Sequence, residues 1–525
     1  MAFRKNDICL PRDLIKIASL LSMAFRHIYM GDQSQSPEKM LKKLCVDEDG
    51  QYFDAAEISV GLGSFRKSFF VAANPELARA IIKSDAVGRY DSPLKIVSTT
   101  GELGIFNSSG DVWKARREQI IDHINPRKIK ERLSEIENEV SSKYLDELSL
   151  ISEEGGLVNP GDFFKRLTFR TFSEQIGLKI DESFHSGINR MAQDSFRHLF
   201  SVPVLFNAIV RKRMPHLGEI SEERSDFDDL RSYCEKQIEE ILKKYAHLPF
   251  DELEDTAATL MEDMVLNYVV QMAEEKQIDV SSALELALLS DDSSFDVYKN
   301  KIIDEVFHLL FAGHDTTGNL LSWSMHRLAS DKRLQKTLYM ALKDVPQESM
   351  SFSVLMNVPE LRGFIFEVLR TTPSVSLALP RKVLKDVTIE FNKAGRTETV
   401  ELKKGTVVST PIFMYHTHPE YFENPDEFDI ERDFRSPAYM PFFNGKNSCP
   451  ARNLALTRAM INVCKLVQNF SIESDLGNEA DLPESEFHFG GFTNAPDSSA
   501  RIRFTKRNSL HVLDYDLGQI EPIAA

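Results

Sequence analysis

Apolar residues recur at intervals of three and four positions over most of the chain between about residues 110 and 345. The strongest such stretch runs from Tyr298 to Ser330. This period is typical of amphipathic α-helices, whose apolar side chains share one face. The central part of the chain is therefore predicted to be mostly helical, with its clearest helix over Tyr298–Ser330.

Segments rich in β-branched and aromatic residues flank this helical region. Ser64–Ala73 has the composition of a strand, and Asn74 after it predicts the start of a helix that continues to about Lys83. Thr417–Tyr439 is rich in Pro, Asp, Asn and Glu and is predicted to be irregular. Further strands are predicted at Val387–Phe391, Glu398–Lys403 and Val407–Val408. The expected fold class is mainly α with a minor β region.

The two ends of the chain carry no clear motif. Leu14–Phe25 is apolar at helical spacing, but Lys16 interrupts it, and it is shorter than the roughly 20 residues that span a bilayer. It is predicted either to lie on a membrane surface or to pack onto the protein. Residues 1–59 are expected to be an N-terminal segment, 60–505 one large domain, and 506–525 a tail.

The composition is that of an ordinary globular protein, with 42% hydrophobic and 27% charged residues. The net charge of −17 disfavours nucleic acid as a partner, because phosphate binding needs a basic surface. The five cysteines lie far apart without a Cys-x-x-Cys pair, which argues against a disulfide framework or a zinc site. A cytoplasmic location is predicted, with peripheral membrane attachment as the alternative.

One cysteine stands in a chemically suggestive place. Cys449 follows a loop that contains aromatic residues and glycine, and it precedes a helix predicted over Pro450–Leu466. Because proline favours the first helical position, Cys449 is expected near the helix N-terminus, where the dipole and unpaired N–H groups favour a thiolate. A thiolate open to a cavity suits a haem iron as its fifth ligand. An ordinary buried thiol is the alternative interpretation.

The predicted central helix contains the sequence Ala-Gly-His-Asp-Thr-Thr at 312–317, in which glycine and threonine are poor helix formers. Small Ala312 and Gly313 would let a flat ligand lie close to the backbone. Asp315 and Thr316 would offer a carboxylate and a hydroxyl for a proton relay beside that surface. A helix kink with polar side chains facing solvent is the alternative.

Glu367 and Arg370 lie three residues apart on a helix predicted over Leu361–Thr371, whose other residues are largely apolar. The ion pair is therefore expected to be buried, and a buried pair needs further partners. Arg432 is the expected third member, and the triad is interpreted as structural.

Trp113 and Arg117 lie one helical turn apart and could bind an anionic group together. Arg381, which follows a Leu-Pro pair, could add a third contact. On its own, Trp113 would more often be a core aromatic residue with a polar edge.

The order and separation of these motifs resemble those of the cytochrome P450 superfamily of haem-thiolate enzymes, over about residues 60–505. The resemblance implies a cytochrome P450-like fold with a single large haem domain, and heme b (iron protoporphyrin IX) as the cofactor. The matching elements are Trp113-x-x-x-Arg117, Ala312-Gly313-x-Asp315-Thr316-Thr317, Glu367-x-x-Arg370, Pro425-x-x-Phe428-x-x-x-Arg432 and Phe442-x-x-Gly445-x-x-x-Cys449, with Ala455 beyond the cysteine.

The resemblance also implies residue roles. Cys449 would be the thiolate ligand of the iron, and Phe442 would belong to the cofactor-binding loop before it. Asp315 and Thr316 would deliver protons to iron-bound dioxygen. The residues expected at the haem propionates are Trp113, Arg117 and Arg381.

Two positions depart from the family pattern. Asn447 stands where the family commonly has an arginine that binds a propionate, and Lys446 is expected to supply the missing charge. Ala451 stands where the family usually has glycine, which is tolerable if the backbone there is already helical. Both changes bear on haem affinity, but neither removes the ligand.

The implied activity is monooxygenation, in which O2 is activated and one oxygen atom enters an apolar small-molecule or lipid-like substrate. Electrons are expected from a separate reductase or ferredoxin, and contact with a membrane surface is a further expectation. The alternatives are a haem-thiolate isomerase or peroxide-using enzyme, and a haem- or lipid-binding protein without activity. The expected pocket segments are 90–107, 195–212, 309–317, 373–379 and 489–496.

Overall fold

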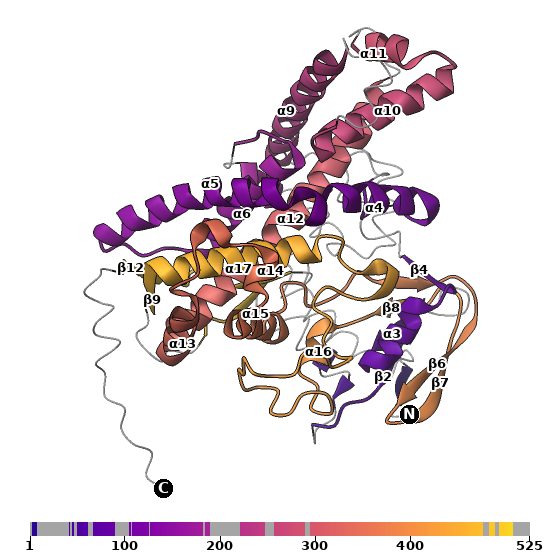
Figure 1. The fold of residues 1–525 in the computed structure, drawn as a ribbon. Helices are drawn as coiled ribbons and strands as arrows, with labels where there is room; N and C mark the ends of the chain where they lie inside the picture. Colours follow the sequence, from indigo (N-terminus) through magenta and orange to yellow (C-terminus); the bar gives the residue numbers. More distant parts are fainter. Residues whose placement is uncertain are drawn as a thin grey trace.

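The computed structural model describes residues 3–7, 41–42, 45–46, 50–60, 67–89, 104–106, 108–124, 126–181, 184–189, 221–246, 257–288, 295–475, 482–488 and 493–507. Over these residues the chain is mainly helical, with one larger sheet and several two-stranded sheets (Figure 1). The predicted fold class, mainly α with a minor β region, is confirmed.

Helix α12 (Asp296–Ser330) runs through the middle of the molecule and is buried along most of its length (Figure 1). A helix that is apolar on most of its faces is stable only inside a core. Its first half packs with α9, α10 and α11, and its second half packs with α13, α15 and α17. The other helices are α3 (Pro75–Lys83), α4 (Gly110–Ile124), α5 (Pro126–Glu153), α6 (Pro160–Ile176), α9 (Ser221–Tyr245), α10 (Leu260–Lys276), α11 (Val280–Leu288), α13 (Lys332–Leu342), α14 (Phe352–Leu355), α15 (Pro359–Thr371), α16 (Ile412–His416) and α17 (Arg452–Asn469).

The main sheet has six strands in the order β1-β2-β3-β8-β5-β4 and lies beside α3 (Figure 1). Strand β3 pairs parallel with β8, and β8 pairs antiparallel with β5. The strands are β1 (Phe3–Asp7), β2 (Ala55–Val60), β3 (Lys67–Ala72), β4 (Val87–Arg89), β5 (Arg381–Val383) and β8 (Val407–Ser409). Strand β2 spans the domain boundary predicted between residues 59 and 60, so residues on both sides of that boundary take part in the main sheet.

Three two-stranded antiparallel sheets complete the β structure of the described residues. They are β6–β7 (Val387–Lys393 and Arg396–Leu402), β9–β12 (Phe470–Ser474 and Ile502–Lys506) and β10–β11 (Ser485–His488 and Thr493–Pro496). The strands predicted between residues 387 and 408 are therefore present, with bounds that differ by one to two residues. Residues 417–439 form turns and bends, as predicted.

The start of α3 follows the local rule that predicted it. The side chain of Asn74 accepts hydrogen bonds from the backbone N–H groups of Glu76 and Leu77, which have no partner inside the helix. Pro75 occupies the first turn, where its missing N–H costs nothing. Leu77 and Ile81 then face the core shared with the main sheet.

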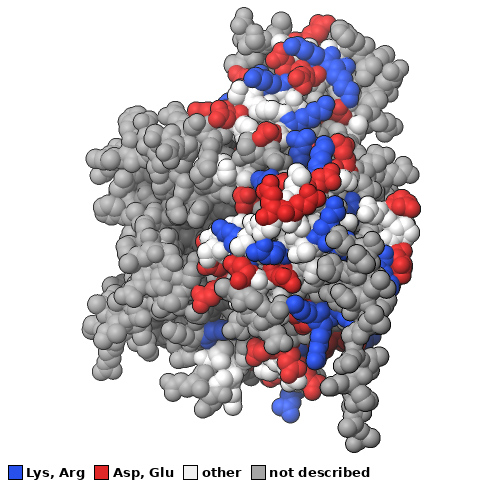
Figure 2. All heavy atoms as spheres, turned by 90° about the vertical axis from the view of Figure 1, so that its left-hand side faces the viewer, with Lys and Arg blue, Asp and Glu red and all other residues white. Residues whose placement is uncertain are grey.

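The surface of the described residues mixes both signs of charge. On the face drawn in Figure 2, Lys and Arg alternate with Asp and Glu over short distances. Lys143 lies beside Glu139 on α5, and Lys243 lies beside Glu239 on α9. On this face the described residues therefore mix both signs of charge.

Several predictions fall on residues that the structure does not describe: the apolar segment Leu14–Phe25, the 506–525 tail apart from its first two residues, and the pocket segment 195–212. Among the helices that the structure does describe, none is both long enough and apolar enough to cross a bilayer.

Candidate functional site: a cysteine-lined cavity beside the central helix

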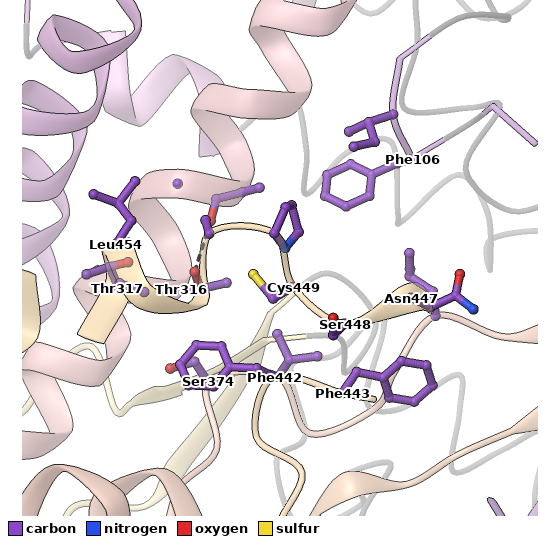
Figure 3. Close-up of a pocket in the computed structure, with 18 of the residues that line it drawn as sticks. Phe106, Thr316, Thr317, Ser374, Phe442, Phe443, Asn447, Ser448, Cys449 and Leu454 are labelled. Carbon is purple, nitrogen blue, oxygen red and sulfur yellow. Dashed lines mark hydrogen bonds between the residues drawn. The ribbon is translucent and has the colours of Figure 1, made fainter. Parts of the chain in front are cut away.

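A largely apolar cavity lies where the two halves of the core meet at α12. Its wall includes Ala312, Gly313 and Thr316 from α12 and Cys449 from the loop before α17. Figure 3 shows Phe106, Thr316, Phe442 and Cys449 around this space. Segments far apart in the sequence thus bring the predicted cysteine and the predicted threonine to one cavity.

The loop before α17 holds Cys449 through its own backbone. The N–H of Cys449 donates to the carbonyl of Phe442 at 2.9 Å, and the N–H of Ser448 donates to that of Gly445 at 3.0 Å. Gly445 has φ +64°, a left-handed conformation that glycine adopts without strain. Phe443 also has a positive φ, +60°, which is uncommon for a bulky residue. The backbone conformation of this loop is therefore specialised.

Helix α17 begins two residues later than predicted. Its first residue is Arg452 and its N-cap is Ala451, so Pro450 lies in a turn before the helix instead of at its first position. Ala451 has φ −90° and ψ 14°, a conformation open to any residue, which explains why glycine is not needed there.

The surroundings of Cys449 act on its thiol in opposite directions. Burial raises the pKa of Cys449, because a thiolate loses its hydration, while the Ala451 N–H and the charges of Arg117 and Arg452 lower it. Burial is the larger effect. The N–H at the start of the helix thus favours the thiolate, as expected, but burial outweighs it.

Three guanidinium groups gather at one edge of the cavity. Arg117 and Arg89 both lie over the Trp113 ring, at 5.6 and 5.3 Å from its centroid. Arg381 lies over the Phe443 ring at 5.3 Å and donates to Asn447 Oδ1 at 3.3 Å. All three arginines line the cavity.

Arg381 lacks a full set of hydrogen-bond partners among the described residues, whereas Arg89 donates to the carbonyl of Phe106 at 3.1 Å. Burial lowers the pKa of Arg381 to about 10, with a contribution from the charge of Arg89, and its Nε has no hydrogen-bond partner among the described residues. None of the described residues that line the cavity is Asp or Glu. A buried cationic edge of this kind requires an anionic ligand.

At two positions, Lys446 and Arg89, the cationic residues around the cavity differ from the sequence prediction. Lys446 is not part of the cavity wall: its side chain is 53% exposed and its ammonium pairs with Asp85 at 3.1 Å. The 3₁₀ turn over Gly445–Asn447 places this side chain near α3, so the expectation that Lys446 binds the cofactor is corrected. Arg89 was missed, because its position becomes meaningful only when β4 pairs with β5 next to Arg381.

Thr316 and Asp315 face different neighbours. The Thr316 hydroxyl donates to the carbonyl of Ala312 at 2.9 Å within α12 and lines the cavity. Asp315 is 0% exposed and does not line the cavity, because its carboxylate pairs with Lys165 of α6 at 2.8 Å. The expectation that both groups lie beside the ligand surface is correct for Thr316 alone.

Close helix packing explains why residue 313 is a glycine, and the sequence did not indicate this. A Cβ added to it would lie 2.6 Å from the ring of Phe172 on α6, far inside contact distance. Gly313 therefore allows α6 and α12 to approach each other. The expected role, space for a flat ligand, stays a prediction, and Gly313 does border the cavity.

The apolar walls identify which predicted residues face inward. Val375, Ala378, Leu379 and Phe311 line the cavity, whereas Phe307, Leu310 and Leu377 do not. From the predicted segment 90–107, the described residues Ile105 and Phe106 contribute. An apolar body with a cationic edge and a sulfur at one face fits a flat, largely apolar cofactor that carries anionic groups on one side.

The predicted ion-pair triad of Glu367, Arg370 and Arg432 is present outside this cavity. Glu367 accepts two hydrogen bonds from Arg370, at 2.7 and 2.8 Å, and one from Arg432 at 3.2 Å. Arg370 also donates to the carbonyls of His416, Pro425 and Glu427. None of the three residues lines the cavity, so the structural interpretation holds.

Comparison with known proteins gives concordant results. The chain is 28% identical over 218 residues to probable cytochrome P450 9f2 of Drosophila melanogaster, which covers 39% of this chain and 41% of that protein. It is 32% identical over 207 residues to cytochrome P450 4V2 of Homo sapiens, covering 37% and 38%. It is 23% identical over 390 residues to indoleacetaldoxime dehydratase of Arabidopsis thaliana, covering 72% of each. The first two matches thus span about two fifths of those relatives.

Solved structures share the fold. A cytochrome P450 (CYP102L1) superposes with a TM-score of 0.59 at 18% identity, over 86% of this chain and 94% of that one. The heme domain of cytochrome P450DA gives a TM-score of 0.59 at 17% identity, over 86% and 89%. A model of the family described as "Cytochrome P450" matches residues 26–498. Since this match covers most of the chain and the cavity presents the expected cysteine, the chain belongs to the cytochrome P450 family.

Proposed function

We propose that the protein is a haem-dependent monooxygenase that inserts one oxygen atom from O2 into an apolar small-molecule or lipid-like substrate. The observation that carries this proposal is the presence of Cys449, Thr316 and a cluster of arginines on one cavity. The family implies haem as the cofactor, and we propose heme b, whose apolar ring with two carboxylates on one edge is complementary to the apolar wall and the arginines.

The residues that would hold the haem follow from the cavity. Cys449 Sγ would ligate the iron, with Phe442 beside it in the loop. A metal cation at the sulfur would overcome the burial effect on this thiol, since ligating thiols are deprotonated. The residues at the anionic edge would be Arg89, Trp113, Arg117 and Arg381. When bound, the haem supplies the activation of dioxygen and the oxidation of a C–H bond.

Proton supply would come from α12. Thr316 Oγ1 lies on the cavity wall, and its hydroxyl hydrogen can pass to a ligand atom once it leaves the carbonyl of Ala312. Asp315 lies behind it, so delivery from this carboxylate requires it to exchange its contacts with Lys165 and Asn319. We therefore assign Thr316 as the group that donates the proton in the cavity. Asp315, behind it, would resupply that proton.

Electrons would come from a separate reductase or ferredoxin. A haem-thiolate isomerase or peroxide-using enzyme without an external reductase is the alternative, and the relative named indoleacetaldoxime dehydratase supports keeping it. The free thiols of Cys234, Cys449 and Cys464 fit the predicted reducing compartment. The N-terminal amphipathic segment and any contact with a membrane surface stay predictions.

The first test is the absorption spectrum of the dithionite-reduced, haem-loaded protein with carbon monoxide. We expect the strongly red-shifted band of thiolate ligation in the wild type and its loss in Cys449→Ser. Cys464→Ser is the matched control, because Cys464 is a free buried thiol on α17 outside the cavity. Failure of the wild type to give this band would overturn the proposal.

The second test separates the monooxygenase from the alternative. In Thr316→Ala, we expect turnover with O2, NAD(P)H and an added reductase or reductase–ferredoxin pair to yield hydrogen peroxide instead of product, with coupling about tenfold lower or worse. Thr316→Ser keeps the hydroxyl and should retain coupling. If Thr316→Ala turns over normally, or if no reductant is needed, the alternative is favoured.

A further inference from the structure

The cavity wall carries a polar atom that the haem site does not use. Ser374 lies just beyond α15, after Pro373, where the chain becomes extended and its residues reach the cavity. The residue is 8% exposed, and its Oγ has no hydrogen-bond partner among the described residues. Figure 3 shows Ser374 at the same cavity as Thr316 and Cys449.

Its surroundings contain more polar atoms of the same kind. The N–H of Asn494 donates to the carbonyl of Ser374 at 3.0 Å, and Thr493 forms a β-bridge with Val375. The Oγ1 of Thr493 and the Oδ1 of Asn494 are also buried without a partner among the described residues. The extended segments at 374–375 and 493–494 are thus joined through their backbones beside the cavity. Side-chain oxygens of Ser374, Thr493 and Asn494 have no hydrogen-bond partner among the described residues.

Two other polar side chains on the wall already have partners. The Thr316 hydroxyl is bonded to Ala312, and Asn447 accepts from Arg381. Leaving a buried hydroxyl without a hydrogen-bond partner is unfavourable. A ligand atom that completes the hydrogen bond of Ser374 therefore gains affinity that an apolar ligand cannot gain.

The chemistry of that ligand atom follows from the donor and its neighbours. A serine hydroxyl donates one hydrogen bond and accepts others, so it is complementary to a hydroxyl or carbonyl oxygen. Val375, Ala378 and Leu379 form the adjoining wall, and a charged group placed against them would lose its hydration without compensation. The cationic edge, by contrast, is the place for anions.

We propose that the substrate is an apolar molecule that carries a neutral oxygen, a carbonyl or hydroxyl, which hydrogen-bonds to Ser374 Oγ. This inference rests on the proposed function and names the substrate class of the same site. Ser374 acts as a specificity residue that selects oxygen-bearing molecules over hydrocarbons of equal size.

The test measures binding instead of turnover. Haem-loaded protein is equilibrated by dialysis against ring-ketone and hydrocarbon pairs of increasing size: cyclooctanone and cyclooctane, and cyclododecanone and cyclododecane. We expect at least one ketone to bind more tightly than its hydrocarbon, and Ser374→Ala to reduce that preference about 3- to 10-fold, as one net hydrogen bond predicts.

Ser376→Ala is the matched control. Ser376 lies two residues along the same segment, is 0% exposed and has an unpartnered Oγ, but it does not line the cavity. We expect this variant to keep the ketone preference of the wild type. Equal loss in both variants would refute a direct contact of Ser374 with the ligand.

Two further outcomes would overturn the inference. One is that no ketone binds more tightly than its hydrocarbon in the wild type. The other is that Ser374→Ala changes the thermal unfolding temperature but not the ketone preference, which indicates that Ser374 holds a structural water. The protein could also show a ketone preference that depends on Ser374 and yet yield no oxygenated product. That result would support this inference and would contradict only the proposed monooxygenation.

Discussion

Glu367 and Arg370 face each other through two hydrogen bonds, of 2.7 and 2.8 Å, and both side chains are 0% exposed. The planar guanidinium fork matches the carboxylate, so that two parallel bonds form. The remaining guanidinium hydrogens reach three backbone carbonyls between His416 and Glu427. The pair therefore fastens helix α15 to the irregular region that leads to the Cys449 loop.

Replacing Arg370 with lysine should destabilise the protein strongly, because an ammonium cannot make the fork or reach all of these carbonyls. We expect a loss of about 3–5 kcal/mol in the free energy of unfolding, measured by urea denaturation. Arg362→Lys is the control, since Arg362 is exposed on the same helix and makes one bond to a carbonyl. Similar losses in both variants would contradict the interpretation.

Arg381 and Lys446 should differ in their effect on haem binding. Arg381 lines the cavity, whereas Lys446 pairs with Asp85 outside it. Loss of one charge-assisted hydrogen bond is worth about 1.5–3 kcal/mol, so Arg381→Ala should weaken haem affinity about 10- to 100-fold. Titration of haem into the apoprotein, followed by absorbance, measures this. Lys446→Ala should change affinity less than about twofold, and a comparable loss there would restore the sequence-based prediction.

Gly313 and Phe172 should behave as a coupled pair. Because a Cβ at residue 313 would collide with the Phe172 ring, Gly313→Ala should cost about 1–3 kcal/mol of stability. Adding Phe172→Leu should recover part of that loss, and a double-mutant cycle on thermal or urea unfolding measures the coupling. If Gly313 instead serves mainly to admit the cofactor, Gly313→Ala will lower haem affinity at unchanged stability.

Four buried histidines should make the protein acid-sensitive. Burial lowers their pKa values to about 3 for His308 and His416, and to about 4 for His314 and His326. An unperturbed histidine has a pKa of 6.5, so the unfolded chain binds more protons than the folded protein below that pH. The free energy of unfolding therefore falls as pH drops from about 6.5 toward the lowered pKa values. Between pH 7 and 5 each imidazole should contribute a loss of about 2 kcal/mol.

Urea unfolding at several pH values tests this expectation. His326 lies on α12 and does not line the cavity, and the lowering of its pKa comes from burial. His326→Phe should therefore reduce the slope of stability against pH by up to one proton in this range. A slope that does not change on this substitution would contradict the assignment.

The sequence by itself determined the features that depend on near neighbours in the chain. The helical period located α12 to within two residues at its start, and the Asn-Pro pair located α3, because periodicity and capping involve residues only a few positions apart. The spacing of Glu367 and Arg370, and the resemblance carried by the motif around Cys449, indicated the triad and the family before any contact was known.

Only the tertiary structure decided which way the site residues face. Asp315 turns to Lys165, which lies 150 positions earlier in the chain, and Arg89 joins Arg381 through strand pairing between β4 and β5. The backbone at residues 374–375 pairs with residues 493–494, and this pairing holds Ser374 at the cavity. Its hydroxyl has no hydrogen-bond partner among the described residues. These orientations depend on which distant segments pack together, and burial then sets the charge and hydrogen bonding of each group, so no pattern of near neighbours could have given them.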